Sequence, residues 1–186
     1  MLTNFQLEDL CEKMDIPLET IVFKSSLKDM KIKYNRSYII NLENEFNEDG
    51  ERNEGSHWCG LQVNKYKNGK LQGFWFDTYG QPSPTEVIDF VGGELPYSNK
   101  DIQSLVADFC GWGTCAWLHF INAFPDRSGD LYDDTEGFLS LFKDLNKTCD
   151  FKHNEFILKH FFQASDPSLR QPISVENQLN PDEILT

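Results

Sequence analysis

Two neighbouring runs of bulky residues, 57–66 and 71–79, leave few folds open to this chain. Both runs carry large side chains at consecutive positions, so neither has a polar face that could lie against water. Such runs are typical of strands in the middle of a sheet that is covered on both sides. The sequence therefore predicts an α+β fold, in which helices pack on a central sheet.

The loop between the two runs, residues 67–69, decides which side chains share a face of that sheet. A two-residue Asn-Gly turn would place His57 and Asp77 on opposite faces, because side chains alternate along a strand. A three-residue loop with Gly69 in the left-handed conformation shifts the register by one residue. The two candidate turns therefore make opposite predictions for this pair.

In the shifted register, His57 faces Tyr79 and Cys59 faces Asp77. His57 and Asp77 are then diagonal neighbours, roughly 7–8 Å apart at the backbone and within reach of each other. A carboxylate among aromatic residues needs a hydrogen-bond partner, because burying it alone is costly, and an imidazole N–H can serve. We therefore predict an odd-length loop, or a bulge with the same effect.

Capping signals and apolar periodicity predict further elements around these strands. They are a helix opened by a capping box at 3–6, a strand at 37–42, a short helix at 83–90 opened by a second capping box and ended by two glycines, a strand near 102–103, and helical segments around 138–145 and 156–161. The acidic stretch 43–56 is expected to be an exposed loop. We predict one domain over 1–165, followed by a polar tail or surface arm at 166–186.

A long apolar helix is predicted over 109–124, with Asp108 as its N-cap. Cys110 falls in its first turn, where unpaired N–H groups and the helix dipole favour a thiolate. Gly111 and Gly113 leave little side-chain bulk beside the sulfur, so that a substrate backbone could approach closely. The competing interpretation is that Cys110 is a small buried hydrophobe, the commonest role of a free cysteine.

Composition limits the partners of the chain. It has 186 residues, of which 39% are hydrophobic, which suits a single domain with a real core. Its formal net charge is −13, from 17 Lys and Arg against 30 Asp and Glu. Such a surface repels phosphate, so neither a nucleic acid nor an anionic membrane is an expected partner. No apolar run approaches the length needed to span a membrane.

The cysteines indicate a reducing environment. Their number is odd and they are widely scattered, at positions 11, 59, 110, 115 and 149. The N-terminus has no cationic start followed by an apolar stretch, so no signal peptide is expected. Free thiols in a reducing compartment, and not a disulfide framework of a secreted protein, are the prediction.

Four residues could together form the active site of a hydrolase that uses a cysteine nucleophile. Cys110 would supply the nucleophile, His57 the base, and Asp77 the group that orients the imidazole. Gln103, near a predicted strand end, could donate an amide N–H to a developing oxyanion together with the backbone N–H of Cys110. This chemistry needs no metal and no cofactor.

The order His57, Asp77, Gln103, Cys110 resembles that of adenain-type cysteine proteases, the maturation proteases of adenoviruses, within the wider group that includes the Ulp1-like SUMO proteases. The matching motifs are Gly-Ser-His-Trp at 55–58, Phe-Asp-Thr-Tyr-Gly at 76–80, and Gln103 followed seven residues later by Cys-Gly-Trp at 110–112. With weaker likeness in the first helix and first strand, the resemblance covers roughly residues 3–125. Its compact length is also similar to that of the proteases of Maverick/Polinton elements and virophages.

This resemblance implies a papain-like Ulp1–adenain fold, with a central mixed sheet flanked by helices and the nucleophile at the N-terminus of a buried helix. It implies cleavage of capsid precursor proteins during virion maturation, in the virion or the host cytoplasm. It also implies substrate contacts for Trp58, Gly111 and Trp112. Stimulation by DNA or by a disulfide-linked peptide, as in adenovirus, is not expected, because the chain is strongly acidic and has no cysteine between Cys59 and Cys110. Asp77 stands where the adenovirus enzymes have glutamate, although aspartate is usual in the wider group.

The sequence also allows other interpretations of these residues. A deubiquitinase or deSUMOylase that trims Gly-Gly tails would use the same site. A papain-type nucleophile at Cys59, with His119 and Asn122 downstream, would sit inside a strand and lack the activation that a helix start gives.

Two further readings involve no catalysis. One is a zinc-binding module with ligands His57, Cys59, Cys110 and Cys115, although these spacings are not those of compact knuckles. The other is a capsid-associated structural protein with incidental cysteines, which predicts no thiol of unusual reactivity.

Overall fold

A four-stranded sheet forms the centre of the molecule in the computed structural model, which describes residues 2–66, 68–104, 109–123 and 130–165. Its strands, in spatial order, are β1 (Leu18–Phe23), β2 (Arg36–Asn41), β3 (Trp58–Lys65) and β4 (Leu71–Phe76). β1 runs parallel to β2, whereas β2, β3 and β4 pair antiparallel, so the sheet is mixed. The predicted α+β class with a central mixed sheet is confirmed.

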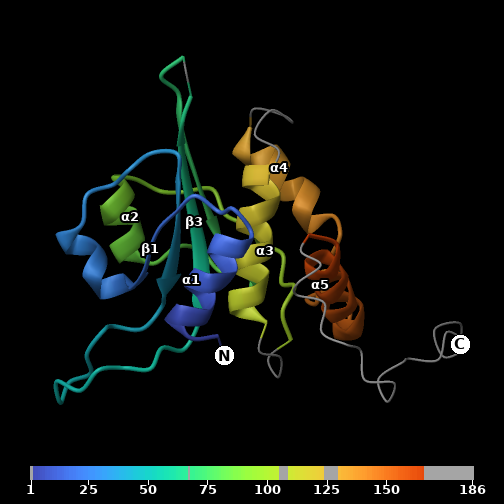
Figure 1. The fold of residues 1–186 in the computed structure, drawn as a ribbon, viewed down its shortest axis with the longest axis horizontal. Helices are drawn as coiled ribbons and strands as arrows, with labels where there is room; N and C mark the ends of the chain where they lie inside the picture. The colour runs from blue at the N-terminus through green and yellow to red at the C-terminus, as the bar shows by residue number, and fades with distance from the viewer. Residues whose placement is uncertain (1, 67, 105–108, 124–129, 166–186) are drawn as a thin grey trace, which may run out of the picture.

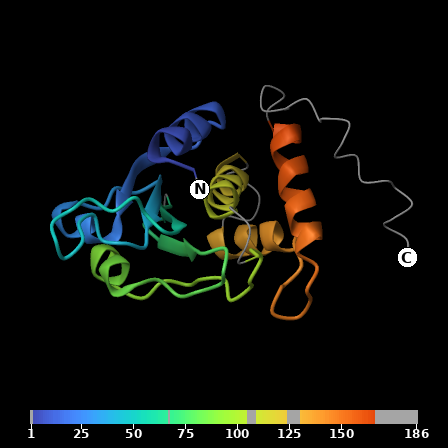
Figure 2. The same ribbon diagram turned by 90° about the horizontal axis from the view of Figure 1, so that it is seen from below.

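Helices cover both faces of this sheet (Figures 1 and 2). They are α1 (Asn4–Lys13), the 3-10 helix η1 (Lys24–Asp29), α2 (Thr85–Val91), α3 (Cys110–Ala123), α4 (Leu131–Leu139) and α5 (Phe151–Ser165). η1 and α2 lie on one face, α1, α3 and α4 lie on the other, and α5 packs outside α3. Among the described residues, no helix has both the length and the apolar character that crossing a bilayer requires.

Two hydrophobic cores lie on opposite faces of the sheet because consecutive strand residues point to opposite sides. Phe74 and Phe76 of β4 enter the core under α3, where Phe76 stacks on Trp117 with ring centroids 4.8 Å apart. Trp75, between them, enters the second core, which η1 and α2 cover. Bulky residues on both faces of these strands are therefore buried, as predicted, except at the start of β4, where Leu71 is 52% exposed.

The α3 helix lies directly on β3 because glycine occupies the crossing point. A Cβ atom at Gly60 would stand 2.7 Å from the ring of Trp117 and 3.2 Å from the methyl group of Thr114. Thr114 also donates a hydrogen bond to the carbonyl of Trp58, at 3.2 Å. This close contact fixes the N-terminus of α3 relative to the start of β3.

Some predicted boundaries are wrong. The second helix begins at Thr85, with Pro84 in an extended conformation as its N-cap and no side-chain capping bond, so the predicted capping box does not form. No strand forms at 102–103, because the N–H of Ile102 donates to the Thr78 carbonyl and its own carbonyl accepts from the side chain of Asn154. These bonds hold an extended segment without a ladder.

The segment predicted as helical around 138–145 is helical only up to Leu139. After a final turn, backbone N–H groups bond to distant parts of the chain: Lys143 donates to the Asn154 side chain and Leu145 to the Asp101 carbonyl. A half-buried edge strand, β1, was not predicted. The expected N-cap Asp108 and the expected tail 166–186 lie outside the described residues.

Candidate functional site

The register of β3 on β4 is that of the three-residue loop. The N–H of Tyr66 donates to the carbonyl of Lys70 at 2.9 Å, and Gly69 is left-handed with φ +82°. Lys65 pairs with Leu71, and the same register continues to the far end of the strand pair. The predicted odd-length loop is therefore confirmed, although Lys67 itself lies outside the described residues.

His57 and Asp77 point to the same face as a result. The Nε2 atom of His57 lies 2.8 Å from Oδ1 of Asp77 and donates to it. Both residues are buried, with 9% and 2% of their surfaces exposed. Asp77 Oδ1 also accepts the backbone N–H of Tyr79 at 2.8 Å, so the carboxylate is held from two sides.

Cys110 is the first residue of α3 and is only 3% exposed. The helix starts there, since the N–H of Gly113 donates to the carbonyl of Phe109 at 2.8 Å. The sulfur of Cys110 is near enough to the ring of His57 to raise the pKa of that ring. Because Nε2 already faces Asp77, Nδ1 is the ring nitrogen left for the sulfur. The imidazole of His57 thus lies between a carboxylate and a cysteine at a helix N-terminus.

The pKa of His57 is raised from 6.5 to about 9. Burial is the largest single influence on it and disfavours the charged ring. The hydrogen bonds to Asp77 and Cys110, and the negative charges of both partners, together outweigh burial. The site therefore favours a protonated imidazole beside Cys110.

Gln103 lies beside the turn that follows β4 and is 4% exposed. Its Oε1 accepts from the hydroxyl of Thr78 at 2.5 Å, and its Nε2 donates to the hydroxyl of Tyr79 at 2.9 Å. Gly80 permits this approach, because a Cβ atom there would stand 2.8 Å from the backbone of Asn99. The structure therefore brings all four predicted catalytic residues to one end of the sheet.

The three residues expected to contact substrate touch the protein itself. Trp58 is 1% exposed and its indole N–H donates to the carbonyl of Leu2 at 2.9 Å. A Cβ atom at Gly111 would meet the side chains of Leu2 and Leu7, at 3.2 Å from each. Trp112 packs edge-on against Phe162 of α5, with centroids 5.1 Å apart. Their substrate contacts stay a prediction.

At Gly113, too, protein fills the space beside the backbone. A Cβ atom there would lie 2.7 Å from the methyl group of Thr78 and 3.0 Å from the ring of Phe109. The two glycines of the Cys-Gly-Trp-Gly sequence thus let α3 seat against its neighbours. This packing, and not open space for a substrate backbone, accounts for both.

Cys59 faces Asp77 from the middle of β3 and has no exposed surface. Burial, followed by the charges of Asp77 and Cys110 and a hydrogen bond to Asp77, raises the pKa of the Cys59 thiol well above its usual range. The partners of the papain-type alternative are engaged elsewhere: His119 Nδ1 donates to the carbonyl of Met14 at 2.8 Å, and Asn122 donates to that of Leu118 at 2.8 Å. Cys59 is therefore a protonated, buried thiol and not a nucleophile.

Metal-ligand atoms also gather here. Three potential ligand atoms lie within 4.8 Å of one another, one from each of His57, Cys59 and Asp77. The hydrogen bond between His57 and Asp77, together with the strand register that sets Cys59 opposite Asp77, already accounts for this grouping. The predicted fourth ligand Cys115 lies in another contact, with its sulfur 3.8 Å from that of Cys11 between α1 and α3. The zinc set predicted from sequence is therefore not brought together as a whole.

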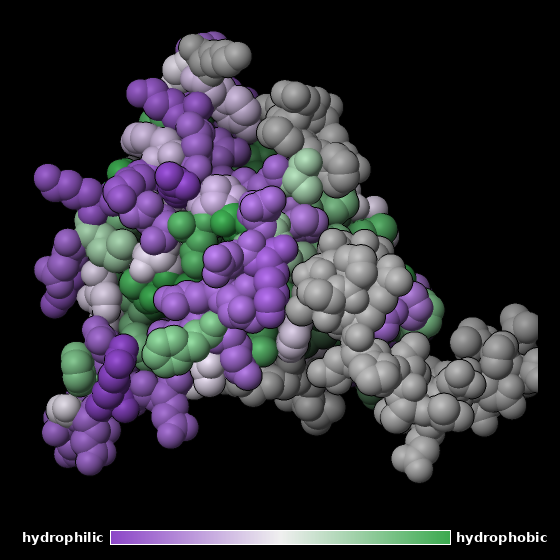
Figure 3. Space-filling model, viewed as in Figure 1, coloured by the Kyte–Doolittle hydropathy of each residue, from purple (hydrophilic) through white to green (hydrophobic). Residues whose placement is uncertain are grey.

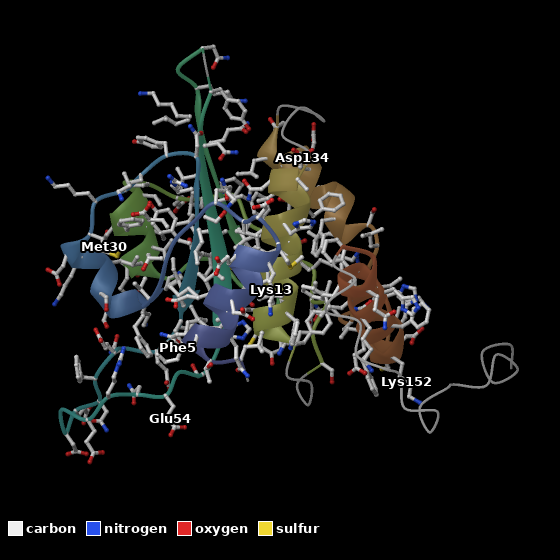
Figure 4. The ribbon with its side chains drawn as sticks, in the orientation of Figure 1. Phe5, Lys13, Met30, Glu54, Asp134 and Lys152 are labelled. Atoms are coloured by element: carbon white, nitrogen blue, oxygen red, sulfur yellow. The ribbon has the colours of Figure 1, made fainter. Side chains whose placement is uncertain are left out.

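The loop at 42–56 joins the end of β2 to His57 and therefore borders the site. Its first N–H, from Leu42, donates to the carbonyl of His57 at 3.1 Å. An open hollow of about 480 Å³ lies in this loop, lined among others by Lys24, Glu43 and Phe46. The loop projects at the lower left of Figure 3, where its surface is mostly hydrophilic, and Glu54 on it lies toward the same end of the molecule as Phe5 of α1 (Figure 4).

Sequence reasoning missed one member of the site. The ring of Tyr79 lies over that of His57, with centroids 4.8 Å apart and planes tilted by 32°. The register prediction already placed Tyr79 opposite His57, which was the available signal. What the sequence could not show is that the hydroxyl also reaches Gln103.

No family model matches the chain, and no curated protein matches its sequence. Function is therefore inferred from the geometry of the site.

Proposed function

We propose that this chain is a cysteine endopeptidase of the papain-like Ulp1–adenain fold. One observation carries the proposal: the imidazole of His57 is hydrogen-bonded to the carboxylate of Asp77 and lies near Cys110 at the first turn of α3, whose sulfur raises the pKa of the ring. A purely structural cysteine would need neither the helix N-terminus nor a charged imidazole beside it. Nucleophile, base and orienting acid in hydrogen-bond sequence are the signature of covalent hydrolysis.

The arrangement supports a two-step reaction. The Cys110 thiolate attacks the peptide carbonyl carbon, and the carbonyl π electrons move onto oxygen, where the backbone N–H of Cys110 and the amide of Gln103 would stabilise the charge. The negative charge returns to carbon as the C–N bond breaks, and the imidazolium of His57 gives its proton to the leaving amine. A thioester remains. Water, deprotonated by His57, then attacks that thioester and restores the thiolate, while Asp77 keeps the ring oriented.

The substrate class rests on the resemblance of the sequence motifs to those of virion maturation proteases. We infer that protein precursors, such as capsid proteins, are the substrates. The alternative of an isopeptidase acting on Gly-Gly tails uses the same four residues. An experiment on the substrate must therefore separate the two.

Alkylation tests the site without knowledge of the substrate. At pH 6, iodoacetamide should label Cys110 faster than the exposed Cys149, because a neighbouring imidazolium and a helix N-terminus favour the thiolate, which is the form that reacts. Mass spectrometry of tryptic peptides gives both rates in one sample. The variant His57→Ala should slow the labelling of Cys110 and leave that of Cys149 unchanged. Equal rates at the two cysteines would contradict the proposal.

Cleavage tests the function directly. The chain is co-expressed with candidate capsid proteins, and new N-termini are read by mass spectrometry, with Cys110→Ala as the inactive control. Fluorogenic ubiquitin-like tails form a second arm. Termini that depend on Cys110 in the first arm support an endopeptidase, and release only in the second arm supports an isopeptidase. Termini that survive in Cys110→Ala would reject the assignment.

A further inference from the structure

Tyr79 contacts both halves of the candidate site. Its half-buried ring lies 4.8 Å from the ring of His57, centroid to centroid, and the two planes are tilted by only 32°. This arrangement limits rotation of the imidazole about its χ2 angle, because turning the ring would drive its edge into the tyrosine face. The ring of Tyr79 therefore helps to set the direction in which both nitrogens of His57 point.

The hydroxyl of Tyr79 contacts Gln103, the predicted oxyanion donor. It accepts from Nε2 of Gln103 at 2.9 Å, while Oε1 of the same amide accepts from the hydroxyl of Thr78 at 2.5 Å. The amide is thus held at both ends, with Oε1 toward Thr78 and Nε2 toward Tyr79. A donor must be held in place before the reaction to stabilise an oxyanion well.

The backbone of Tyr79 completes the set. Its N–H donates to Oδ1 of Asp77 at 2.8 Å, the oxygen that also faces His57. The turn is closed by the N–H of Gly80, which donates to the carbonyl of Asp77 at 2.9 Å. A single residue thus touches the base, the orienting acid and the predicted oxyanion donor.

We propose that Tyr79 is a positioning residue, whose ring aligns the imidazole of His57 and whose hydroxyl holds the amide of Gln103 for the oxyanion. This inference rests on the proposed function and adds a residue to its machinery. The two roles are chemically separable. Tyr79→Phe removes only the hydroxyl, whereas Tyr79→Leu removes the stacked ring as well.

Two reactions distinguish the roles. Peptide hydrolysis needs the oxyanion donor, whereas alkylation of a thiolate by iodoacetamide passes through no oxyanion and needs only the imidazolium–thiolate pair. Tyr79→Phe should therefore lower kcat about tenfold with little change in KM, and leave alkylation of Cys110 at pH 6 unchanged. Tyr79→Leu should lower kcat further and slow alkylation about tenfold.

The matched controls are Tyr132→Phe and Tyr132→Leu. Tyr132 is 49% exposed and packs on Phe74, away from the site, so both variants should keep wild-type kcat and alkylation rate. Thermal unfolding identifies variants that fail to fold. A double-mutant cycle of Tyr79→Phe with Gln103→Ala should show that the hydroxyl matters only while the amide is present.

A readout that needs no substrate keeps this test separate from that of the proposed function. The side-chain NH₂ signals of Gln103 in a ¹⁵N spectrum should move toward exposed-glutamine positions in Tyr79→Phe and stay in place in the Tyr132 variants. If the wild type cleaves nothing, the proposed function fails, but these signals and the alkylation rates still test the contacts of Tyr79. Wild-type kcat and unmoved Gln103 signals in Tyr79→Phe, or wild-type alkylation in Tyr79→Leu, would overturn the inference.

Discussion

His57 and Asp77 lie 20 positions apart in the chain, yet Nε2 of one is 2.8 Å from Oδ1 of the other, because they occupy diagonal positions at the ends of two paired strands. The pair depends on a loop of odd length. Removing one residue from that loop would shift the register and move one partner to the opposite face. The strand register thus determines the protonation chemistry of the site.

The first prediction concerns the pH dependence of catalysis. Activity needs the imidazolium, whose pKa is raised to about 9, so kcat/KM should fall as the pH rises through about 9. Asp77→Asn removes a charge that raises this pKa, and should move the alkaline limb down by roughly 1 to 3 pH units. The pH–rate profiles of the two proteins measure this. The surface variant Asp9→Asn, which loses only an exposed ion pair with Lys13, should leave the limb in place.

The second prediction is a loss of stability between pH 6.5 and about 9. A group that binds its proton more tightly in the folded protein stabilises the fold below its unfolded pKa and loses that contribution as the pH rises through its folded pKa. For His57 this contribution is at most about 3 kcal/mol. Urea unfolding at pH 6 and pH 9.5 should show the decrease in the wild type and a smaller one in His57→Gln. An equal decrease in both would mean that other groups cause it.

The third prediction separates the cysteines of the site. Cys110→Ala should abolish hydrolysis and change the melting temperature little, because it removes one sulfur atom. Cys59→Ser should retain measurable hydrolysis and selective alkylation of Cys110, because Cys59 is fully buried and burial keeps the pKa of its thiol raised. Single-turnover assays and thermal unfolding provide the measurements. Full activity in Cys110→Ala together with none in Cys59→Ser would reverse the assignment.

Much of this site could be predicted from local sequence signals. Gly69 indicated the loop, the loop fixed the register, and the register placed Asp77 within reach of His57. Cys110 at the head of an apolar helix followed from periodicity. These predictions succeeded because each depends on backbone geometry that neighbouring residues determine.

The parts that were missed depend on contacts between distant segments. β1 (Leu18–Phe23) is an edge strand with half-buried residues, so its sequence carries no alternation of apolar and polar residues to mark it. The segment around Ile102 has the composition of a strand, but its carbonyl bonds to a side chain of α5. The hydroxyl contact of Tyr79 with Gln103 likewise joins two segments whose distance no local pattern encodes.

The fourth prediction concerns Asn154 of α5, whose side chain is hydrogen-bonded to the segment around Ile102. Its Nδ2 donates to the carbonyls of Ile102, at 3.0 Å, and Lys143, at 2.8 Å, and its Oδ1 accepts from the N–H of Lys143 at 2.8 Å. Asn154→Ala leaves these buried backbone groups without the partner, which should cost about 2–4 kcal/mol of unfolding free energy.

The residue next to Ile102 is Gln103, so Asn154→Ala should also lower kcat more than it raises KM. Asn53→Ala is the matched control, because the side chain of Asn53 also donates to a backbone carbonyl, that of Asn44, but in the outer loop. Urea unfolding and steady-state kinetics test both effects. A full kcat in a measurably destabilised Asn154→Ala would show that the segment holds Gln103 without help from α5.

The last prediction concerns the packing of the start of α3 against the turn that follows β4. A Cβ atom at Gly113 would lie 2.7 Å from the methyl group of Thr78, which is fully buried and hydrogen-bonded to Gln103. Gly113→Ala should therefore push the start of α3 away from the turn, and we expect a loss of about 1–3 kcal/mol of unfolding free energy despite the better helix propensity of alanine.

Gly137→Ala makes the same substitution inside α4, where a Cβ atom would lie at an ordinary 3.9 Å from the ring of Phe120. That variant should gain up to about 1 kcal/mol, because only the propensity changes. Displacement of α3 also carries Cys110 away from His57, so Gly113→Ala should slow its alkylation at pH 6 and Gly137→Ala should not. If both variants gain stability and label at the wild-type rate, the close contact of Gly113 with Thr78 does not position the nucleophile.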